Sequence, residues 1–255
     1  MNKRNKILKY WSTRSRKKNL KCTNDHLLEK FEIQCILPKI KKNSKVLDIG
    51  CGDGSLLKEL FTKKKIKGVG IDFSNELIKV AKKKSKKIKF ICYDMLKIKE
   101  LKQEINAFDY IITKRSIQNL TSWNYQKKIL NELHKFCKKN TKIILVESSK
   151  NGLQNINLLR RKFNLKNIKM PWHNLYLDDN KIIKSRFKKI KLVKIEEIFS
   201  TYYFISRIIN AIYSKNLKRQ PKYNDHLNFI GWKLPQDIVK NYSQLKVYNF
   251  KKISS

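Results

Sequence analysis

The sequence predicts an α/β fold in which a doubly wound, mostly parallel sheet carries helices on both faces. Between residues 45 and 147, short runs rich in branched apolar residues alternate with segments of helical spacing. Such alternation is typical of a parallel sheet with crossover helices. The chain has 255 residues and is 41% hydrophobic, which is enough for a large domain with its own core.

Five strands are expected in this region. They lie at 45–49, 66–71, 88–92, 108–113 and 141–147. The helices between them are expected at 54–65, 74–86 and about 122–138. The second of these helices shows the pattern well, because Leu77, Ile78 and Ala81 fall on one face.

The two ends of the chain are less regular. We expect residues 1–40 to form an N-terminal helical arm or cap and residues 41–255 to form the main domain. An insertion at about 148–190, helical at first and then aromatic, is expected to cover the site. Further elements are expected as a strand at 191–199, an apolar helix at 201–213 and a last strand within 222–235.

The formal net charge of +40 suggests nucleic acid or an anionic membrane as a partner. However, only 9 of the 60 basic residues are Arg, and the chain holds 32 Ile and 24 Asn but 3 Ala. A drift that also affects neutral and apolar residues indicates an AT-rich genome, whereas a nucleic-acid surface would recruit more Arg. We therefore expect no nucleic-acid partner, although basic charge remains compatible with a phosphate-bearing small substrate.

The cysteines and the apolar runs narrow the class of protein further. The five cysteines form no CxxC pair and lack zinc-like spacing to a His, which favours a reduced, cytoplasmic protein without a metal. Asp178 and Asp179 are adjacent, but no acidic or histidine cluster accompanies them. No apolar run approaches 18 residues, and no apolar stretch follows the basic N-terminus, so neither a transmembrane segment nor a secretory signal is expected.

Glycine is scarce, yet three of the seven glycines alternate directly after the first expected strand, in VLDIGCGDG. Gly50, Gly52 and Gly54 indicate a tight turn that lets the backbone approach a ligand. A phosphate-binding P-loop motif is absent, and the GxGxxG dinucleotide pattern fails at Ser55. Asp48, just before the loop, would repel a pyrophosphate but suits an amino or sulfonium group.

Two further acids follow the next two strands. Asp72 ends the second strand and is placed to accept hydrogen bonds from both hydroxyls of a ribose. Asp94 follows the third strand, where an adenine amino group could donate to it. One acid suits the amino-acid end of a ligand, one suits a ribose and one suits an adenine. S-adenosylmethionine is a ligand that has all three of these parts.

Residues 45–147 resemble the class I S-adenosylmethionine-dependent methyltransferases, which have a Rossmann-like sheet. The motifs that carry this resemblance are VLDIGCGDG, GVGIDFS, CYDM, FDYIITKRSIQNL and TKIILVE. The resemblance implies that the glycine loop lines the methionine part and the adenosine. It also implies that Asp72, followed by Phe73, holds the ribose, and that Asp94 meets the adenine amino group with Met95 beside the ring. The segment from Thr113 to residue 116 would pass the methionine end.

The N-terminal segment KYWSTRSRKKN resembles one that folds over the cofactor in some members of this family. In that case Arg14 would meet the methionine carboxylate. The alternative is a solvated basic arm.

A second, less specific resemblance concerns residues 147–213, which look like those of bacterial methyltransferases found with surface-polysaccharide or sugar-modification genes. It implies a hydroxyl of a sugar or sugar phosphate as the methyl acceptor. Methyltransferases that act on base amino groups carry [ND]PP[YFW] after the fourth strand, where this chain reads TKRS. RNA or another macromolecule remains the alternative acceptor.

A hydroxyl acceptor needs a base to take its proton. His173, in PWHNLY within the expected insertion, is the first candidate, with a packed or capping role as its alternative. Glu147 at the end of the fifth strand is the second, as a base or as a residue that orients the substrate, with hydrogen bonding in a turn as its alternative. Structural roles are favoured for three other histidines and two tyrosines, although the tyrosines could also line the pocket. These residues are His26, His134, His226, Tyr202 and Tyr203.

Overall fold

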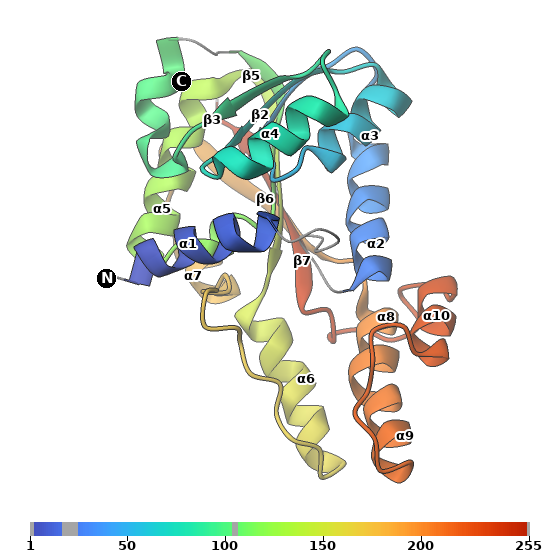
Figure 1. The fold of residues 1–255 in the computed structure, drawn as a ribbon. Helices are drawn as coiled ribbons and strands as arrows, with labels where there is room; N and C mark the ends of the chain where they lie inside the picture. The colour runs from blue at the N-terminus through green and yellow to red at the C-terminus, as the bar shows by residue number, and fades with distance from the viewer. Residues whose placement is uncertain (1–2, 17–24, 104–106, 254–255) are drawn as a thin grey trace.

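The computed structural model describes residues 3–16, 25–103 and 107–253, and its centre is a seven-stranded sheet of order β3-β2-β1-β4-β5-β7-β6 (Figure 1). Strands β1 to β5 run parallel, and β7 runs antiparallel to both β5 and β6. The doubly wound, mostly parallel fold that the sequence predicts is confirmed. The strands are β1 (Lys45–Ile49), β2 (Lys67–Asp72), β3 (Lys89–Cys92), β4 (Phe108–Lys114), β5 (Cys137–Ser148), β6 (Ile190–Glu197) and β7 (Leu245–Lys252).

Helices precede, connect and follow these strands. The α-helices are α1 (Lys3–Arg16), α2 (His26–Ile36), α3 (Ser55–Lys64), α4 (Asn75–Lys84), α5 (Trp123–Glu132), α6 (Lys150–Lys162), α7 (Asp179–Lys184), α8 (Ser200–Phe204), α9 (Asn210–Asn216) and α10 (His226–Lys233). Short 3₁₀ segments are η1 (Leu37–Lys39), η2 (Met95–Gln103), η3 (Ile117–Asn119) and η4 (Leu133–Phe136). One π-helical turn, η5 (Ile205–Ile209), joins α8 to α9.

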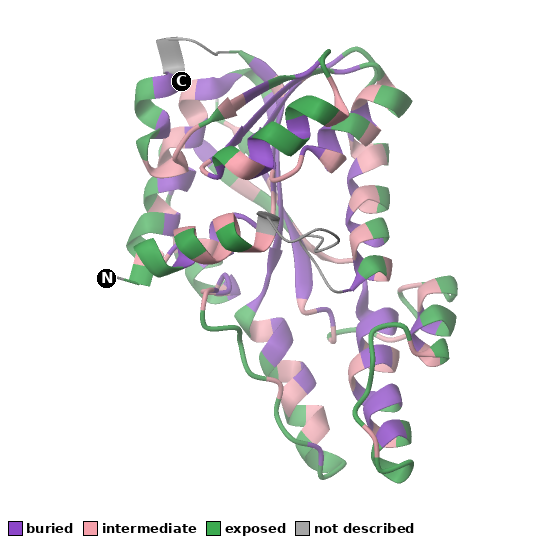
Figure 2. Ribbon diagram, in the orientation of Figure 1, coloured by how far each residue is buried: buried purple, intermediate pink, exposed green. Residues whose placement is uncertain are grey.

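Side chains alternate between two cores, one on each face of the sheet, as the period of two along a strand requires. Val46 faces the core formed with α2, α3 and α4, whereas its neighbour Leu47 faces the core formed with η2, α5 and η4. Ile112 and Ile111 divide in the same way. In Figure 2 most of the sheet is coloured as buried, whereas the helices beside it carry buried, intermediate and exposed residues. Because β1 has neighbours on both sides whose connections cover opposite faces, a crevice opens beyond the carboxyl ends of β1 and β4.

Two helical segments extend away from the sheet. Helix α6 and the continuous segment α8–η5–α9 lie side by side below the sheet in Figure 1, and α6 contacts η5. Helix α1 packs against α4 and, through Tyr10, against the rings of Trp172 and His173 in the segment between α6 and α7. Among the described residues, no helix has the length and apolar character needed to cross a membrane.

The expected last strand within 222–235 is wrong. Residues 226–233 form α10, and the last strand is β7, ten residues further along the chain. The sequence of β7, LKVYNFKK, does not read as an apolar run because Lys246 lies within it. Lys246 is nevertheless buried, because its ammonium group contacts Asp179 at 2.9 Å and Glu197 at 2.7 Å.

Candidate active site

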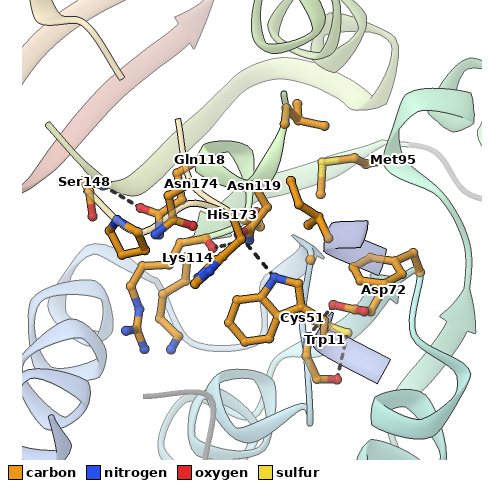
Figure 3. A pocket seen from close by; sticks show the side chains of 18 of the residues that line it. Trp11, Cys51, Asp72, Met95, Lys114, Gln118, Asn119, Ser148, His173 and Asn174 are labelled. Atoms are coloured by element: carbon orange, nitrogen blue, oxygen red, sulfur yellow. Dashed lines mark hydrogen bonds between the residues drawn. The ribbon is translucent and has the colours of Figure 1, made fainter. Parts of the chain in front are cut away.

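A cavity of about 320 Å³ lies at the carboxyl ends of the parallel strands (Figure 3). It brings together most of the residues that the sequence singles out. Those that line it are Arg14, Asp48, Gly50, Gly52, Asp72, Phe73, Asp94, Met95 and His173. Gly54, Thr113 and Glu147 do not line it.

The glycine loop is tightly packed, and the lack of side chains is required at two of its positions. Gly50 has a φ of +76°, and a Cβ there would come within 2.2 Å of the Ser116 Cβ. Gly54 has a φ of +74°, and a Cβ there would come within 2.7 Å of the Phe90 ring. Positive φ disfavours other residues at both positions. The loop therefore turns tightly, and the backbone of Gly50 and Gly52 lines the cavity.

Asp72 joins the loop to the end of β2. Its carboxylate accepts hydrogen bonds from the backbone N–H of Gly52 and of Ser74, each at 2.9 Å. The side chain is buried, and burial raises the pKa of Asp72, while these two N–H groups oppose the rise. A carboxylate has about four lone-pair positions, so Asp72 retains acceptor capacity towards the cavity.

Asp48 is the most deeply buried acid of the cavity. Burial raises its pKa to about 7, the charges of Asp72 and Glu147 act in the same direction, and Lys114 acts against them. Its Oδ1 atom makes no hydrogen bond to any described residue. A buried carboxylate oxygen of this kind is stabilised by a positive group, so the site fits a ligand with a cationic portion.

Helix α1 closes the cavity over Asp94. The Arg4 guanidinium forms an ion pair with the Asp94 carboxylate, which also accepts a hydrogen bond from the Leu96 backbone N–H at 3.0 Å. Trp11 donates from its indole nitrogen to the Asn119 side-chain oxygen at 3.3 Å, as Figure 3 shows. The arm thus contributes side chains to the cavity rather than remaining a solvated tail.

His173 lies where α1 meets the segment between α6 and α7. Its ring stacks on Tyr10 at 4.4 Å between centroids, and the edges of Trp11 and Trp172 complete an aromatic enclosure. Burial lowers the pKa of His173, and the positive charge of Arg14 lowers it further. The ring is therefore neutral at pH 7 and able to accept a proton.

Neutral polar groups line the same cavity as His173. The Asn174 side chain lines the cavity, and its buried oxygen makes no hydrogen bond to any described residue. The Gln118 side chain also lines the cavity, and its oxygen accepts a hydrogen bond from the backbone N–H of Ser148 at 3.0 Å. Tyr176 accepts a hydrogen bond from the Gln244 side chain at 3.0 Å. These groups match the hydrogen bonding of hydroxyl groups.

Glu147 lies outside the cavity lining and takes part in the hydrogen bonding of a turn. Its fully buried carboxylate accepts hydrogen bonds from the Thr113 hydroxyl at 2.8 Å and from the backbone N–H groups of residues 116, 117 and 118 at 3.1, 3.1 and 3.3 Å. Burial raises its pKa to about 6, and these four donors oppose the rise and keep it ionised at pH 7. Glu147 therefore fixes the turn after β4, where Arg115 has a φ of +52°.

The other candidates from the sequence lie elsewhere. The remaining histidines, His26, His134 and His226, do not line the cavity. Tyr202 is a core residue whose hydroxyl donates to Asp25 at 2.7 Å, whereas Tyr203 lines the cavity. Within the described residues, no three potential metal ligands cluster.

The sequence indicates that the arm folds over the cofactor but singles out only Arg14 within it. Tyr10 and Trp11, in the same segment, and Arg4, outside it, also line the cavity. Arg207 also lines it, from the π-helical turn, which has no sequence signature. Asn174 could have been found, because it follows His173 directly.

Comparisons with known proteins agree with this architecture. The sequence profile of a methyltransferase domain family matches residues 40–190. A search of curated protein sequences gave no significant match. The chain belongs to this family: it is a class I methyltransferase, and its cofactor is S-adenosylmethionine.

Several solved structures share the fold. A chain from the complex of the Haloferax volcanii Trm112 methyltransferase activator with a methyltransferase has a TM-score of 0.63 at 12% identity, over 97% of this chain and 98% of that chain. The N-methyltransferase NodS from Bradyrhizobium japonicum, in complex with S-adenosylhomocysteine, has a TM-score of 0.59 at 10% identity, over 97% and 99%. Magnesium protoporphyrin IX methyltransferase from Synechocystis, with bound S-adenosylhomocysteine, has a TM-score of 0.52 at 12% identity, over 89% and 83%. At these identities the likeness concerns the fold.

The cavity fits this cofactor on its own geometry. The backbone of Gly50 and Gly52 lines the cavity, and the buried Asp48 oxygen suits a cationic group beside it. Asp72 supplies a carboxylate at the next strand end.

Proposed function

We propose that the protein transfers a methyl group to a hydroxyl of a small, sugar-type acceptor, either a sugar or a sugar phosphate. One observation carries the proposal. The neutral ring of His173 lines the same cavity as the glycine loop and is held there by stacking on Tyr10. A base in this position takes the proton of an attacking hydroxyl, a role that typically accelerates a reaction by about 10² to 10⁴.

In this proposal the cofactor half is formed by the glycine loop and three acids. Asp72 binds the ribose hydroxyls, with Phe73 beside them, and Asp94 and Met95 contact the adenine. Asp48 stabilises the cationic methionine end, and Arg14 binds its carboxylate. Bound S-adenosylmethionine supplies a sulfonium methyl group that a nucleophile attacks in line.

The acceptor half orients the hydroxyl and manages its proton. His173 takes the proton, and the Asn174 oxygen accepts a hydrogen bond from an acceptor hydroxyl. A buried acceptor without a partner costs about 1–3 kcal/mol, so a ligand that donates to Asn174 is favoured. Alignment of this kind supplies up to roughly 7–11 kcal/mol of a barrier when the geometry is ideal.

Glu147 and Thr113 act as positioning residues in this account. Their mutual hydrogen bond and the three backbone N–H groups fix the turn that leads to Gln118. The neutral amides and hydroxyls near His173 support a polyol acceptor, and the resemblance of residues 147–213 to sugar-modifying methyltransferases suggests surface-polysaccharide synthesis in the cytoplasm.

A macromolecular acceptor such as RNA is the alternative, and the net charge of +40 is the observation that favours it. Binding that is tight and falls steeply with salt would be expected of an RNA substrate. Filter binding of total RNA to the full chain at about 150 mM salt distinguishes the two proposals.

The direct test is methyl transfer from labelled cofactor to a panel of hexoses, hexose phosphates, nucleotide-linked hexoses and RNA. We expect O-methylation of one of the sugar classes, and its loss in the His173→Ala variant. Transfer to an amine, or to RNA alone, would overturn the proposal.

A further inference from the structure

We propose that the guanidinium of Arg207 binds an anionic substituent of the acceptor, either a phosphate or a carboxylate. This inference deepens the proposed function and rests on it, because it adds a chemical feature to the same acceptor. Arg207 lines the cavity together with Tyr203 and Tyr223. None of these residues belongs to a motif of the cofactor-binding half.

A π-helical turn places Arg207 in the cavity. Residues 205–209 form η5 between α8 and α9, so that the helix is widened where Arg207 leaves it. Such turns are rare and occur frequently at functional sites. The Arg207 carbonyl is satisfied by a hydrogen bond from the Arg160 guanidinium, which comes from α6. The turn is thus stabilised from the neighbouring helix.

Aromatic rings flank the guanidinium. The Arg207 Cζ atom lies 5.4 Å from the centroid of the Tyr203 ring and 5.3 Å from that of the Tyr223 ring. Cation–π contacts of this kind restrict the plane of the group. Asp25 fixes its rotation within that plane, because the Asp25 carboxylate accepts from Arg207 Nη2 at 2.9 Å.

Asp25 is itself held rigidly. It caps the first turn of α2 by accepting from the Leu28 backbone N–H at 3.0 Å, and it accepts from the Tyr202 hydroxyl at 2.7 Å. The orientation of Arg207 is therefore set before any ligand arrives. Preorganised donors lose less entropy on binding than mobile ones.

The guanidinium retains donors for a ligand. A guanidinium carries five N–H groups, and Arg207 uses one of them for Asp25 among the described residues. Its side chain is 17% exposed, and it reaches the cavity. Two parallel N–H groups in a fixed plane match the two oxygens of a carboxylate or phosphate.

Four more cations line the same cavity, Arg4 and Arg14 from α1 and Lys114 and Arg115 at the end of β4. Lys114 and Arg115 contact the fully buried Glu32 carboxylate at 3.1 and 2.9 Å. Because Asp25 and Glu29 line the cavity as well, net charge alone does not select an anion. The preference for an anion comes from the planar guanidinium of Arg207, whose paired N–H donors are held in one orientation. An ammonium group cannot reproduce this arrangement.

The experiment measures binding without methyl transfer, so that its failure is distinct from failure of the proposed function. The full chain, saturated with S-adenosylhomocysteine, is titrated by calorimetry with inorganic phosphate, glucose 6-phosphate, glucuronate and glucose. Arg207→Lys keeps the positive charge but removes the paired N–H donors of the planar guanidinium. Arg186→Lys is the matched control, because Arg186 is exposed and lies outside the cavity.

We expect glucose 6-phosphate or glucuronate to bind more tightly than glucose, and Arg207→Lys to weaken that binding by about tenfold or more, as for the loss of one charge-assisted hydrogen bond. Arg186→Lys should leave it unchanged. The stronger of the two sugar ligands identifies the substituent as a phosphate or a carboxylate, and inorganic phosphate shows whether the anion alone suffices.

Equal affinities in the Arg207→Lys and Arg186→Lys proteins, or no preference for either charged sugar over glucose, would overturn the proposal. If Arg207→Lys fails to fold, Tyr223→Leu provides the second test. Tyr223 is 48% exposed, so its loss is tolerable for the fold, and it removes one ring beside the guanidinium. It should weaken binding of the charged sugar several-fold, and unchanged affinity would again contradict the inference.

Discussion

The two halves of the cavity are built in different ways. On the cofactor side, the backbone N–H groups of two glycines hold the loop to the end of β2. Gly50 donates to the Ile71 carbonyl at 2.8 Å, and Gly52 donates to the Asp72 carboxylate at 2.9 Å. On the acceptor side, His173 and Arg207 are held by stacked rings and ion pairs between segments far apart in the chain. The first half is thus fixed by the fold, whereas the second can change with a few side chains. Variants that affect one half and spare the other test this division.

The largest effect is expected from His173→Ala. Without the proton acceptor, turnover at saturating cofactor should fall by about 10² to 10⁴. Affinity for S-adenosylhomocysteine, measured by calorimetry, should stay within about twofold, because the ring belongs to the acceptor half. Equal turnover in the variant and the natural protein would exclude His173 as the base.

Asp72→Ala is expected to change the affinity for the cofactor, which His173→Ala should leave nearly unchanged. Two ribose hydroxyls lose their acceptor, and the Gly52 and Ser74 N–H groups lose theirs, so affinity for S-adenosylhomocysteine should fall by about 100-fold or more. Calorimetry measures this, and a thermal unfolding curve checks that the variant is folded. An unchanged affinity would mean that the ribose assignment is wrong.

Glu147→Gln is expected to weaken the turn between the halves. The amide keeps one acceptor oxygen for four donors, so the free energy of unfolding should fall by about 1–3 kcal/mol in urea denaturation. Glu100→Gln, at an exposed position, is the control and should have little effect. If Glu147 were the base instead, the variant would lose turnover as severely as His173→Ala while keeping its stability.

The response of the pH profile to removal of Arg14 distinguishes the two candidate bases, because the charge of Arg14 lowers the pKa of His173. The base must be deprotonated, and because burial and Arg14 lower the pKa of His173, activity should persist as the pH falls below the ordinary histidine value of about 6.5. Arg14→Gln removes a nearby positive charge, so the acid limb of the turnover profile should move to higher pH at saturating cofactor. A limb that does not move would show that another group controls the profile.

The smallest effect is expected from Arg4→Gln. The Arg4–Asp94 ion pair closes α1 over the cofactor half, but both side chains are partly exposed, and such pairs contribute about 0–1 kcal/mol. Affinity for S-adenosylhomocysteine should change by no more than about fivefold. A larger loss would place α1 among the main determinants of cofactor binding.

The sequence predicted the cofactor half better than the acceptor half for a physical reason. Asp48, Gly50 and Asp72 follow strands whose apolar runs are visible, and parallel strands bring their carboxyl ends to one edge. The fold class and β1 were predicted correctly because local periodicity determines them.

The acceptor half depends on contacts that no local pattern encodes. His173 was found because histidines are few, but its stacking on Tyr10 joins residues 163 positions apart. The contacts of Glu147 are likewise tertiary, because its carboxylate accepts hydrogen bonds from the backbone N–H groups of the turn after β4. The π-helical turn at Arg207 and the buried Lys246 of β7 arise from tertiary partners, and their sequences carry no sign of them.

The most direct test of the divided cavity is a crystal structure of the full chain with S-adenosylhomocysteine. The account predicts the ribose at Asp72, the adenine beside Met95 and the thioether sulfur facing the side of the cavity that holds His173 and Asn174. Adenosine bound instead against Arg207 and Tyr203, or a sulfur directed away from His173, would contradict it.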